Sequence, residues 1–473
     1  MTQQISSPPE ETPEHLSQPL PAQEPHFSRP GIISFLVLVG LLLLLFTGLV
    51  VRNIPQVAKS PVKKSIIPQS VVSPTAVPVN SILQLPGKSE QATLQIPAGS
   101  YVVYEQRMNI YFMSTIDGIP HVINTPGYIY NRSTSSLLTP GGQLLYSGNG
   151  LWLTDIFSGH PHQIAKLPAR QVITSLALSS DGTTVAWSTE PVDGHGDVTI
   201  YAGPLERSLP VYHHTVNDCP CFRVFSFMNG QDKYNNTTLL LADDRGDHHA
   251  VQYGLWAFDL SQKSAQEPEQ LLSEAQPAGP LALAPSSNIL LYSNYEGFVP
   301  APTDGSVPDD ATSLTYANSL SITTVSNNPA SLGKERVILR EQHELSNSAE
   351  YRWVTTPLFS PDNRTLLYVE FSSDAEDPYI RRSALYTVQL SGSNGHLQVR
   401  TPQLLATTTA HFMELGAWVN SHIVTFYADG SIYALDTNTG AAAALANITA
   451  LTKKSTTNSA YASIVAVVNH KSH

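Results

Sequence analysis

The sequence predicts an all-β protein, a β-propeller of six to seven blades preceded by one transmembrane helix. Two observations support this prediction. A turn followed by a short apolar strand recurs along most of the chain, and one stretch near the N-terminus is long and apolar enough to span a bilayer. The chain therefore divides into a disordered tail (1–30), a transmembrane helix (31–51), a stalk (52–88) and a propeller domain (89–470).

Composition narrows the classes of function. The chain has 473 residues, of which 41% are hydrophobic and 14% charged, and its net charge is −12. Because no block of Lys or Arg is present, nucleic acid is not an expected partner. The two cysteines, Cys219 and Cys221, exclude a disulfide framework and a four-thiolate zinc site.

Residues 31–51 (GIISFLVLVGLLLLLFTGLVV) contain no charged side chain. About 20 such residues in a helix span a hydrocarbon core of about 30 Å. The alternative is a cleaved signal peptide, whose apolar core is shorter and ends at a small-residue cleavage site. Here Arg52 follows directly and no A-x-A pattern is present, which favours an uncleaved anchor and a single-pass protein of the cell membrane.

The charges that flank this helix conflict with the expected orientation. Arg29 is the single basic residue of the tail, whereas the flank after the helix carries Arg52, Lys59, Lys63 and Lys64. A positive-inside count keeps the C-terminal domain in the cytoplasm, but long domains are translocated largely regardless of charge. We expect an extracytoplasmic domain, because a short tail followed by a signal anchor is the simplest route of export.

The segments on either side of the helix lack the apolar content of a folded core. Residues 1–30 are rich in Pro, Gln, Ser and Glu and are predicted to be disordered. Residues 52–88 contain prolines at 55, 61, 68, 74 and 78, which favour an extended, semi-rigid stalk. The alternative is that part of this segment forms an edge strand, which the prolines disfavour.

The first repeated pattern is a turn of Pro, Asp, Gly or Asn, followed by an apolar run that ends in an aromatic residue. It occurs at 96–104, 139–147, 179–188, 284–293 and 360–369.

The second pattern is an aliphatic–aromatic pair, often followed by an Asp and a Gly. A third apolar stretch, such as 162–167 or 403–407, then closes the unit. The pairs are Ile110–Tyr111, Leu151–Trp152, Leu255–Trp256, Leu385–Tyr386 and Ile432–Tyr433.

Each repeat describes a meandering sheet of three to four strands, which must pack against its neighbours to bury both faces. Seven candidate units open near residues 92, 134, 172, 222, 279, 353 and 412. Units four and five are degenerate, so six blades remain an alternative, and a pair of β-sandwiches is the structural rival. The segment 461–469 is predicted to be a strand that completes the ring with the first or last blade.

Two segments carry a family resemblance. The sequence SPDNRTLLYVEFSSD (360–374) followed by SALYTVQLSG (383–392) resembles the repeat of TolB-like propellers, and SSDGTTVAWSTE (179–190) is a second match. The resemblance covers about residues 90–450 and implies a propeller fold. Such repeats occur in periplasmic adaptors and in peptidase propeller domains, so they imply no particular chemistry. No hydrolase domain follows the repeats in this sequence.

No common catalytic or nucleotide-binding fingerprint is present, so the sequence predicts neither a catalytic residue nor a cofactor. A soft metal could bind His213, His214 and the two cysteines around Asp218. The alternative is a pair of loop cysteines, either free or joined in a strained disulfide, because no second ligand pair completes a tetrahedral set.

A second polar cluster is the segment ADDRGDHHA, with Asp243, Asp244, Asp247, His248 and His249. It could bind calcium, but the EF-hand spacing is missing and a solvated turn is the simpler interpretation. Its Arg245-Gly246-Asp247 triplet is an adhesion motif in other contexts, but three residues recur by chance and the motif needs a specific loop geometry. Five aspartates at matching repeat positions are predicted to hold turns: Asp155, Asp181, Asp259, Asp362 and Asp436.

Residues 299–318 and 372–382 lengthen two of the units, and we expect a partner to bind there, although tolerated surface insertion is an alternative. The predicted function is non-enzymatic: a membrane-tethered propeller that recognises a protein, peptide or glycan. One alternative is a propeller lyase or hydrolase with a metal or a His/Asp site at the central channel, for which the candidates are His195, His213, His248 and His411. Another is a structural wall protein without a specific ligand.

Overall fold

The structure of the protein is a computed structural model. The chain divides into two units, residues 1–68 and 69–473. The predicted tail, the predicted transmembrane helix and most of the predicted stalk lie outside the described residues, and no helix among those described is long and apolar enough to cross a membrane. The structure describes residues 83–84 and 93–469, except for 107, 130–135, 193–196, 216–220, 229–236, 244–252, 262–266, 278–280, 299–315, 328–329, 340–349, 375–380, 393–396, 409–412 and 449–461.

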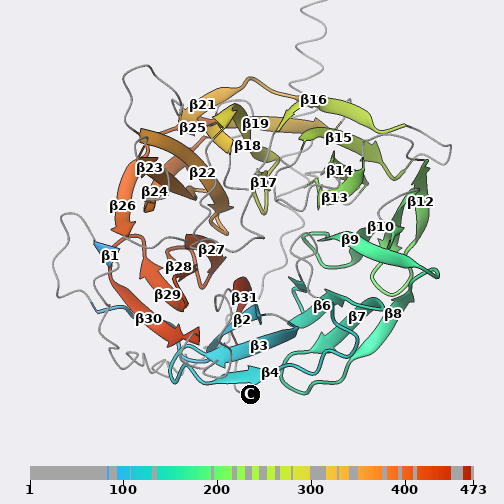
Figure 1. Cartoon of the computed structure of the whole chain (residues 1–473), viewed down its shortest axis with the longest axis horizontal. Coiled ribbons are helices and arrows are strands. Elements are labelled where there is room, and N and C mark those ends of the chain that lie inside the picture. Colours follow the sequence, from blue (N-terminus) through green and yellow to red (C-terminus); the bar gives the residue numbers. More distant parts are fainter. Residues whose placement is uncertain are drawn as a thin grey trace, which may run out of the picture. The chain divides into compact units, whose positions relative to one another are not determined.

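Within the second unit, seven antiparallel sheets follow one another around a ring, so the unit is a seven-bladed β-propeller (Figure 1). In each blade the first strand lies innermost and the fourth lies at the rim. From the centre outward, blade one contains β31 (Ser463–Asn469), β2 (Ser100–Gln106), β3 (Asn109–Ser114) and β4 (Pro120–Val122). Blade two contains β5 (Leu137–Leu138), β6 (Gln143–Ser147), β7 (Gly150–Asp155) and β8 (His162–Lys166). Blade three contains β9 (Gln171–Leu178), β10 (Thr184–Pro191), β11 (Val198–Pro204) and β12 (Leu209–His214).

The remaining four blades follow the same order, with the fourth strand split in blades five and six. Blade four contains β13 (Phe222–Phe227), β14 (Thr238–Asp243), β15 (Tyr253–Asp259) and β16 (Glu269–Pro277), and blade five contains β17 (Ala282–Leu283), β18 (Ile289–Phe298), β19 (Tyr316–Asn327), β20 (Ala330–Leu332) and β21 (Arg336–Leu339). Blade six contains β22 (Glu350–Phe359), β23 (Thr365–Asp374), β24 (Arg381–Ser391), β25 (Gln398–Val399) and β26 (Gln403–Thr408). Blade seven contains β27 (Met413–Trp418), β28 (Ile423–Ala428), β29 (Ser431–Asp436) and β30 (Ala442–Asn447).

The ring is closed by strands from opposite ends of the repeat region. β31 pairs antiparallel with β2, from Ser100 opposite Asn469 to Glu105 opposite Ser463. Blade one therefore takes its innermost strand from the C-terminal end and its other three from the N-terminal end. The prediction that 461–469 completes the ring is confirmed, and the blade number is seven.

One short strand precedes the propeller repeats. β1 (Leu83–Gln84) pairs with the last two residues of β26, Thr407 and Thr408, at the rim of blade six. At least these two residues of the segment 52–88 thus form an edge strand, which was the alternative to a continuous stalk.

The described core lies between the blades. Six clusters of buried apolar side chains fill the junctions of neighbouring blades, and the largest joins blades six, seven and one. A single blade cannot cover both of its own faces, so each blade is stabilised by its two neighbours.

The two sequence patterns meet in space as cross-strand aromatic pairs. An aromatic residue of the second strand lies opposite an aromatic residue of the third strand, and the rings stack with centroids 3.9–6.3 Å apart and interplanar angles of 5–15°. The pair is absent from the two blades that were degenerate in sequence, where Leu241 faces Trp256 and Tyr292 faces Ser321. The stacked pairs are Tyr104–Tyr111, Tyr146–Trp152, Trp187–Tyr201, Tyr368–Tyr386 and Phe426–Tyr433.

Candidate binding sites on the two faces of the propeller

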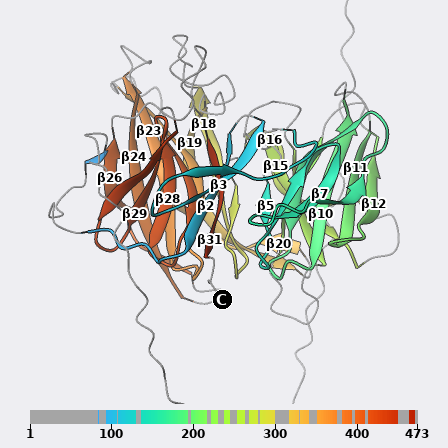
Figure 2. The same ribbon diagram turned by 90° about the horizontal axis from the view of Figure 1, so that it is seen from below.

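Strand alternation sorts the connections of the propeller onto two faces. The strands run from one face of the ring to the other (Figure 2). Connections between the first and second strands of a blade, and between the third and fourth, therefore lie at one face, which we call the turn face. Connections between the second and third strands, and from one blade to the next, lie at the opposite face, which we call the loop face.

The turn face is built from short aspartate-centred turns. Asp155 accepts hydrogen bonds from the amides of Phe157 and Ser158, at 3.0 and 2.6 Å. Asp436 accepts from the amides of Asn438 and Thr439, at 2.8 and 3.1 Å. These bonds satisfy backbone donors that the ladder leaves free at the turn.

The other three aspartates do the same. Asp181, Asp259 and Asp362 accept the amides of Thr183, Ser261 and Arg364, at 3.0, 2.8 and 3.1 Å. The pKa values of Asp155 and Asp362 are lowered, chiefly by hydrogen bonds from Ser158 and Ser360 respectively. The prediction that the five repeated aspartates hold turns is confirmed.

The loop face receives the longest connections. The segments 123–136, 299–315 and 448–462 all begin and end there, because they join strands whose adjoining ends lie at this face. The two predicted insertions also start from it: β18 and β19 part at the pair Phe298–Tyr316, and β23 and β24 part beyond Ser373–Arg381. Residues 299–315 and 375–380 themselves lie outside the described residues.

A buried carboxyl lies at the loop-face ends of blades one and two. Glu105 is 2% exposed, and its Oε1 accepts the amide of Ser136 at 2.9 Å. Nearby, the Ser463 hydroxyl donates to Glu414 Oε1 at 3.0 Å. Burial raises the pKa of Glu105, and the charge of Glu414 raises it further, whereas hydrogen bonds from Ser136 and Tyr128 oppose the rise. Glu105 thus binds the backbone at Ser136, directly before the innermost strand of blade two.

Blades three and four are joined by a buried ion pair. Arg223 Nη2 on β13 lies 3.0 Å from Glu190 Oε2 on β10, and the two side chains are 9% and 21% exposed. Beside it, the hydroxyl of Ser175 accepts the amide of Val224 at 2.6 Å. These polar contacts set the register of one innermost strand against the next blade.

Of the predicted histidine and cysteine cluster, His213 and His214 lie on the rim strand β12, whereas Cys221 lies directly before the innermost strand β13. His213 lies on β12, where its Nε2 is 3.1 Å from Asp197 and its Nδ1 is 3.1 Å from the Thr199 hydroxyl. A carboxylate, an imidazole and a hydroxyl in this order can activate a nucleophile. Here the His213 and Asp197 side chains are 57% and 45% exposed, so water screens their interaction.

The other predicted metal ligands that the structure describes, His214 and Cys221, contact different groups. His214 packs edge-on against Phe222 and stacks on Tyr212. The Cys221 amide donates to Asp243 Oδ1 at 2.8 Å, and Asp243 is fully buried at the end of β14. Among the described residues no group of three or more His, Cys, Asp or Glu is arranged to hold a metal. Outside the described residues lie Asp218, Cys219, Asp244, Arg245, Gly246, Asp247, His248, His249, His195 and His411.

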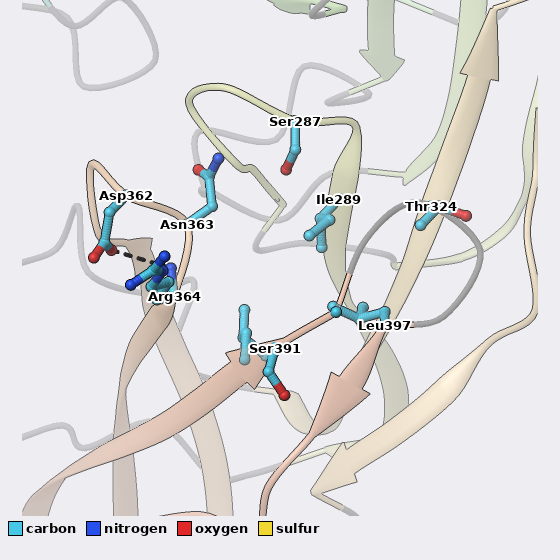
Figure 3. Close-up of a pocket in the computed structure, with 10 residues that line it drawn as sticks. Ser287, Ile289, Thr324, Asp362, Asn363, Arg364, Ser391 and Leu397 are labelled. Carbon is cyan, nitrogen blue, oxygen red and sulfur yellow. Dashed lines mark hydrogen bonds between the residues drawn. The ribbon is translucent and has the colours of Figure 1, made fainter.

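A cavity of about 520 Å³ opens at the turn face between blades five and six. Blade five contributes Ser287, Ile289 and Thr324, and blade six contributes the turn 362–364 together with residues 390–392 and Leu397. Figure 3 shows Ser287, Asn363 and Arg364 around Ile289 and Leu397, with the Arg364 amide bonded to Asp362. This volume is within the range of small-molecule sites.

The turns that border the cavity meet in a different way from the matching turns between blades two and three. Between blades two and three, Gly182 packs so closely on the Pro140 ring that a Cβ at this glycine would lie 2.4 Å from the proline Cδ. Between blades five and six, the position of Gly182 is taken by Asn363, also in the left-handed region with φ 57°. Its amide group donates to the Ser286 hydroxyl, and its Oδ1 accepts the Ser286 amide at 3.4 Å.

Sequence reasoning did not find this cavity. It treated the SPDN turn as a structural repeat, and the turn does have that role. The available signal was the replacement of the usual turn glycine by Asn363 and of Thr183 by Arg364 at equivalent positions of two matching turns.

No protein-family model matches the chain, and neither does any curated protein sequence. Solved structures with a similar backbone include hydrazine synthase of Kuenenia stuttgartiensis, at 10% identity over 71% of this chain and 83% of that chain, with a TM-score of 0.39. TolB from Acinetobacter baumannii is similar at 13% identity over 66% of this chain and 68% of that chain, with a TM-score of 0.34.

A periplasmic gluconolactonase of Pseudomonas aeruginosa is similar at 12% identity over 74% of this chain and 96% of that chain, with a TM-score of 0.44. These likenesses concern the backbone alone. The assignment of a seven-bladed β-propeller rests on the strand pairing of this chain.

Proposed function

We propose that this chain is a membrane-tethered, non-enzymatic binding protein that recognises a protein, peptide or glycan partner through the loop face of its propeller. The observation that carries the proposal is the sorting of connections: the segments 123–136 and 448–462 and both insertions start from one face of the ring. Variable loops on a rigid scaffold are the usual means by which a propeller forms a binding surface.

The described polar groups support binding over catalysis. The repeated aspartates are engaged in turns, Glu190 pairs with Arg223, and Glu105 is fastened to Ser136. Catalytic groups must be free to exchange protons or to attack a substrate. Among the described residues, the arrangement that would suit an enzyme is the exposed Asp197–His213 pair with the Thr199 hydroxyl.

The tether is the second part of the proposal. Residues 31–51 have the length and composition of a bilayer-spanning helix, and the proline-rich segment after them would hold the propeller away from the surface. The propeller would lie outside the cytoplasm, although the basic flank after residue 51 favours the opposite orientation.

Site-specific photo-crosslinking in cells tests the loop-face proposal. A photoreactive side chain at Asp304, within the first insertion, should capture a partner that is identified by mass spectrometry. The matched position is Asn438, an exposed residue in a turn-face connection. We expect adducts from Asp304 only.

Shortening the second insertion supplies the control. Replacing residues 375–380 with a short Gly-Ser turn leaves the paired strands β23 and β24 able to form their hairpin. Loss of the Asp304 adduct in this variant supports a shared surface. The same adduct from both crosslinking positions, or none from the loop face, would contradict the proposal.

The tether is tested separately by cell fractionation and protease treatment. Deleting residues 31–51 should release the protein from membranes. Protease added to intact cells should digest the propeller of the full chain. A propeller that is protected in intact cells and cleaved only after lysis would show that the domain lies inside.

A further inference from the structure

We propose that the cavity between blades five and six is a second binding site, which takes a carboxylate carried on a short aliphatic group. This chemistry occurs in the C-terminal residue of a peptide that ends in Leu, Ile or Val, and in small branched-chain acids. The site lies on the turn face and does not depend on the loop-face partner.

The polar side of the cavity supplies hydrogen-bond donors. Arg364 is an exposed residue of the lining; Figure 3 shows it next to Asp362, with Asn363 on the same side and Ser287 on the side of blade five. A guanidinium recognises a carboxylate through two parallel N–H···O bonds. Asp362 lies next to Arg364 in the turn, and hydrogen bonds, first from Ser360 and then from the Arg364 amide, lower the pKa of its carboxyl. Because Asp362 is negatively charged, the carboxylate of a ligand must approach Arg364 from the side away from Asp362.

The other side of the cavity is aliphatic. Leu390 and Leu397 are 5% and 8% exposed, and Ile289 is half-buried beside them. These three side chains form the apolar part of the cavity lining. A ligand that satisfies both sides needs a charged group and a branched hydrocarbon group close together, as in a C-terminal leucine.

The backbone holds the two sides in place. The Leu390 amide donates to the Arg364 carbonyl at 2.7 Å, so the apolar part and the charged turn are bonded directly. The contacts between Asn363 and Ser286 join the turns of blades five and six across the opening. Because these bonds exist without a ligand, little ordering is needed on binding.

Fluorescence anisotropy with the full-length chain in detergent micelles tests the site. The probe is fluorescein-labelled Gly-Gly-Ser-Leu with a free C-terminal carboxylate, compared with the same peptide ending in an amide. We expect the amide to bind about tenfold more weakly or worse, because it lacks the charge that faces Arg364. Arg364→Met should weaken binding of the acid by a similar factor, and Ser391→Trp should block the cavity.

Two variants are matched controls. Thr183→Met changes the equivalent turn position at the junction sealed by Pro140, and Arg336→Met removes an exposed charge elsewhere on blade five. Both should bind the acid peptide within about twofold of the unmodified chain. Thermal melts of all variants should coincide, because the four changed side chains are exposed.

Competition with N-acetyl-leucine separates the two sources of ligand. Displacement of the peptide at similar concentrations identifies small acids as the ligand class, and failure to displace identifies peptide C-termini. The proposal is overturned if the acid peptide does not bind at up to about 10 mM, if acid and amide bind equally, or if Arg364→Met binds as the unmodified chain does.

Discussion

The buried ion pair between blades three and four gives the sharpest test of how the ring is held together. Glu190→Ala removes the carboxylate that pairs with Arg223 Nη2, and the Arg223 side chain, only 9% exposed, stays between two blades. Breaking a buried pair costs about 3–5 kcal/mol of unfolding free energy, because the remaining charge is desolvated without compensation. Glu190 is itself 21% exposed, so water can enter after truncation, and we expect a cost near the lower end, about 3 kcal/mol.

A double-mutant cycle separates the pair from its surroundings. Arg223→Met should cost less, about 1–2 kcal/mol, since the carboxylate left behind already reaches solvent. Glu190→Ala combined with Arg223→Met removes both charges at once and should cost no more than about 2 kcal/mol, because no unpaired charge is left between the blades. The implied coupling energy is about 2 kcal/mol or more.

Urea unfolding followed by near-ultraviolet and far-ultraviolet circular dichroism measures these differences, provided that the two transitions coincide. The cost of Glu190→Ala should persist at high salt, because a buried pair is screened far less than a surface pair. Two results would refute the interpretation that this pair stabilises the junction of blades three and four as a buried ion pair. One is a cost of Glu190→Ala below about 1 kcal/mol, and the other is a double variant whose cost equals the sum of the two single costs.

Three further perturbations follow from the described contacts. Because the pKa of Glu105 is raised in the folded state, its contribution to stability is largest below the unfolded pKa and is lost as pH rises through the folded value. Glu105→Gln should flatten the profile of melting temperature against pH from about pH 4, the ordinary pKa of a glutamate, upward; parallel profiles would show that another group is responsible. Phe426→Leu removes a fully buried stacked ring and should cost about 2 kcal/mol in urea unfolding, and a neutral result would show that the aromatic pairs are dispensable. Gly118→Ala combines φ +65° with a Cβ 2.4 Å from the Leu445 carbonyl oxygen, whereas Gly142→Ala has φ +80° but open space. The first should lower stability by about 2–3 kcal/mol and the second by about 1 kcal/mol, and equal costs would contradict the close contact between blades one and seven.

The blade boundaries were predictable because turn chemistry is local. Units were expected to open near 134, 172, 222, 279, 353 and 412, and the innermost strands of blades two to seven begin at 137, 171, 222, 282, 350 and 413. Ser360 and Asp362, for example, bond to amides within five residues, so their pattern is visible in one short window. The degenerate appearance of blades four and five also has a structural counterpart in their missing aromatic pairs.

The site residues were less predictable because they depend on contacts between distant segments. His213 and His214 are adjacent in sequence, yet successive side chains of a strand point to opposite faces, and each histidine packs against a different neighbour. Ser286 and Asn363 are 77 residues apart, and their hydrogen bond depends on how two blades meet. No periodicity in the sequence reports such a contact.

The sequence by itself determined the all-β class, the repeat, the turn aspartates and the strand that closes the ring, since each arises from residue types within a few positions of one another. Only the tertiary structure decided that there are seven blades, that the insertions share a face, and that a cavity opens between blades five and six. The physical reason is that a blade's core, its register and its cavities form at junctions between blades, where packing between residues far apart in the chain determines which side chains are buried.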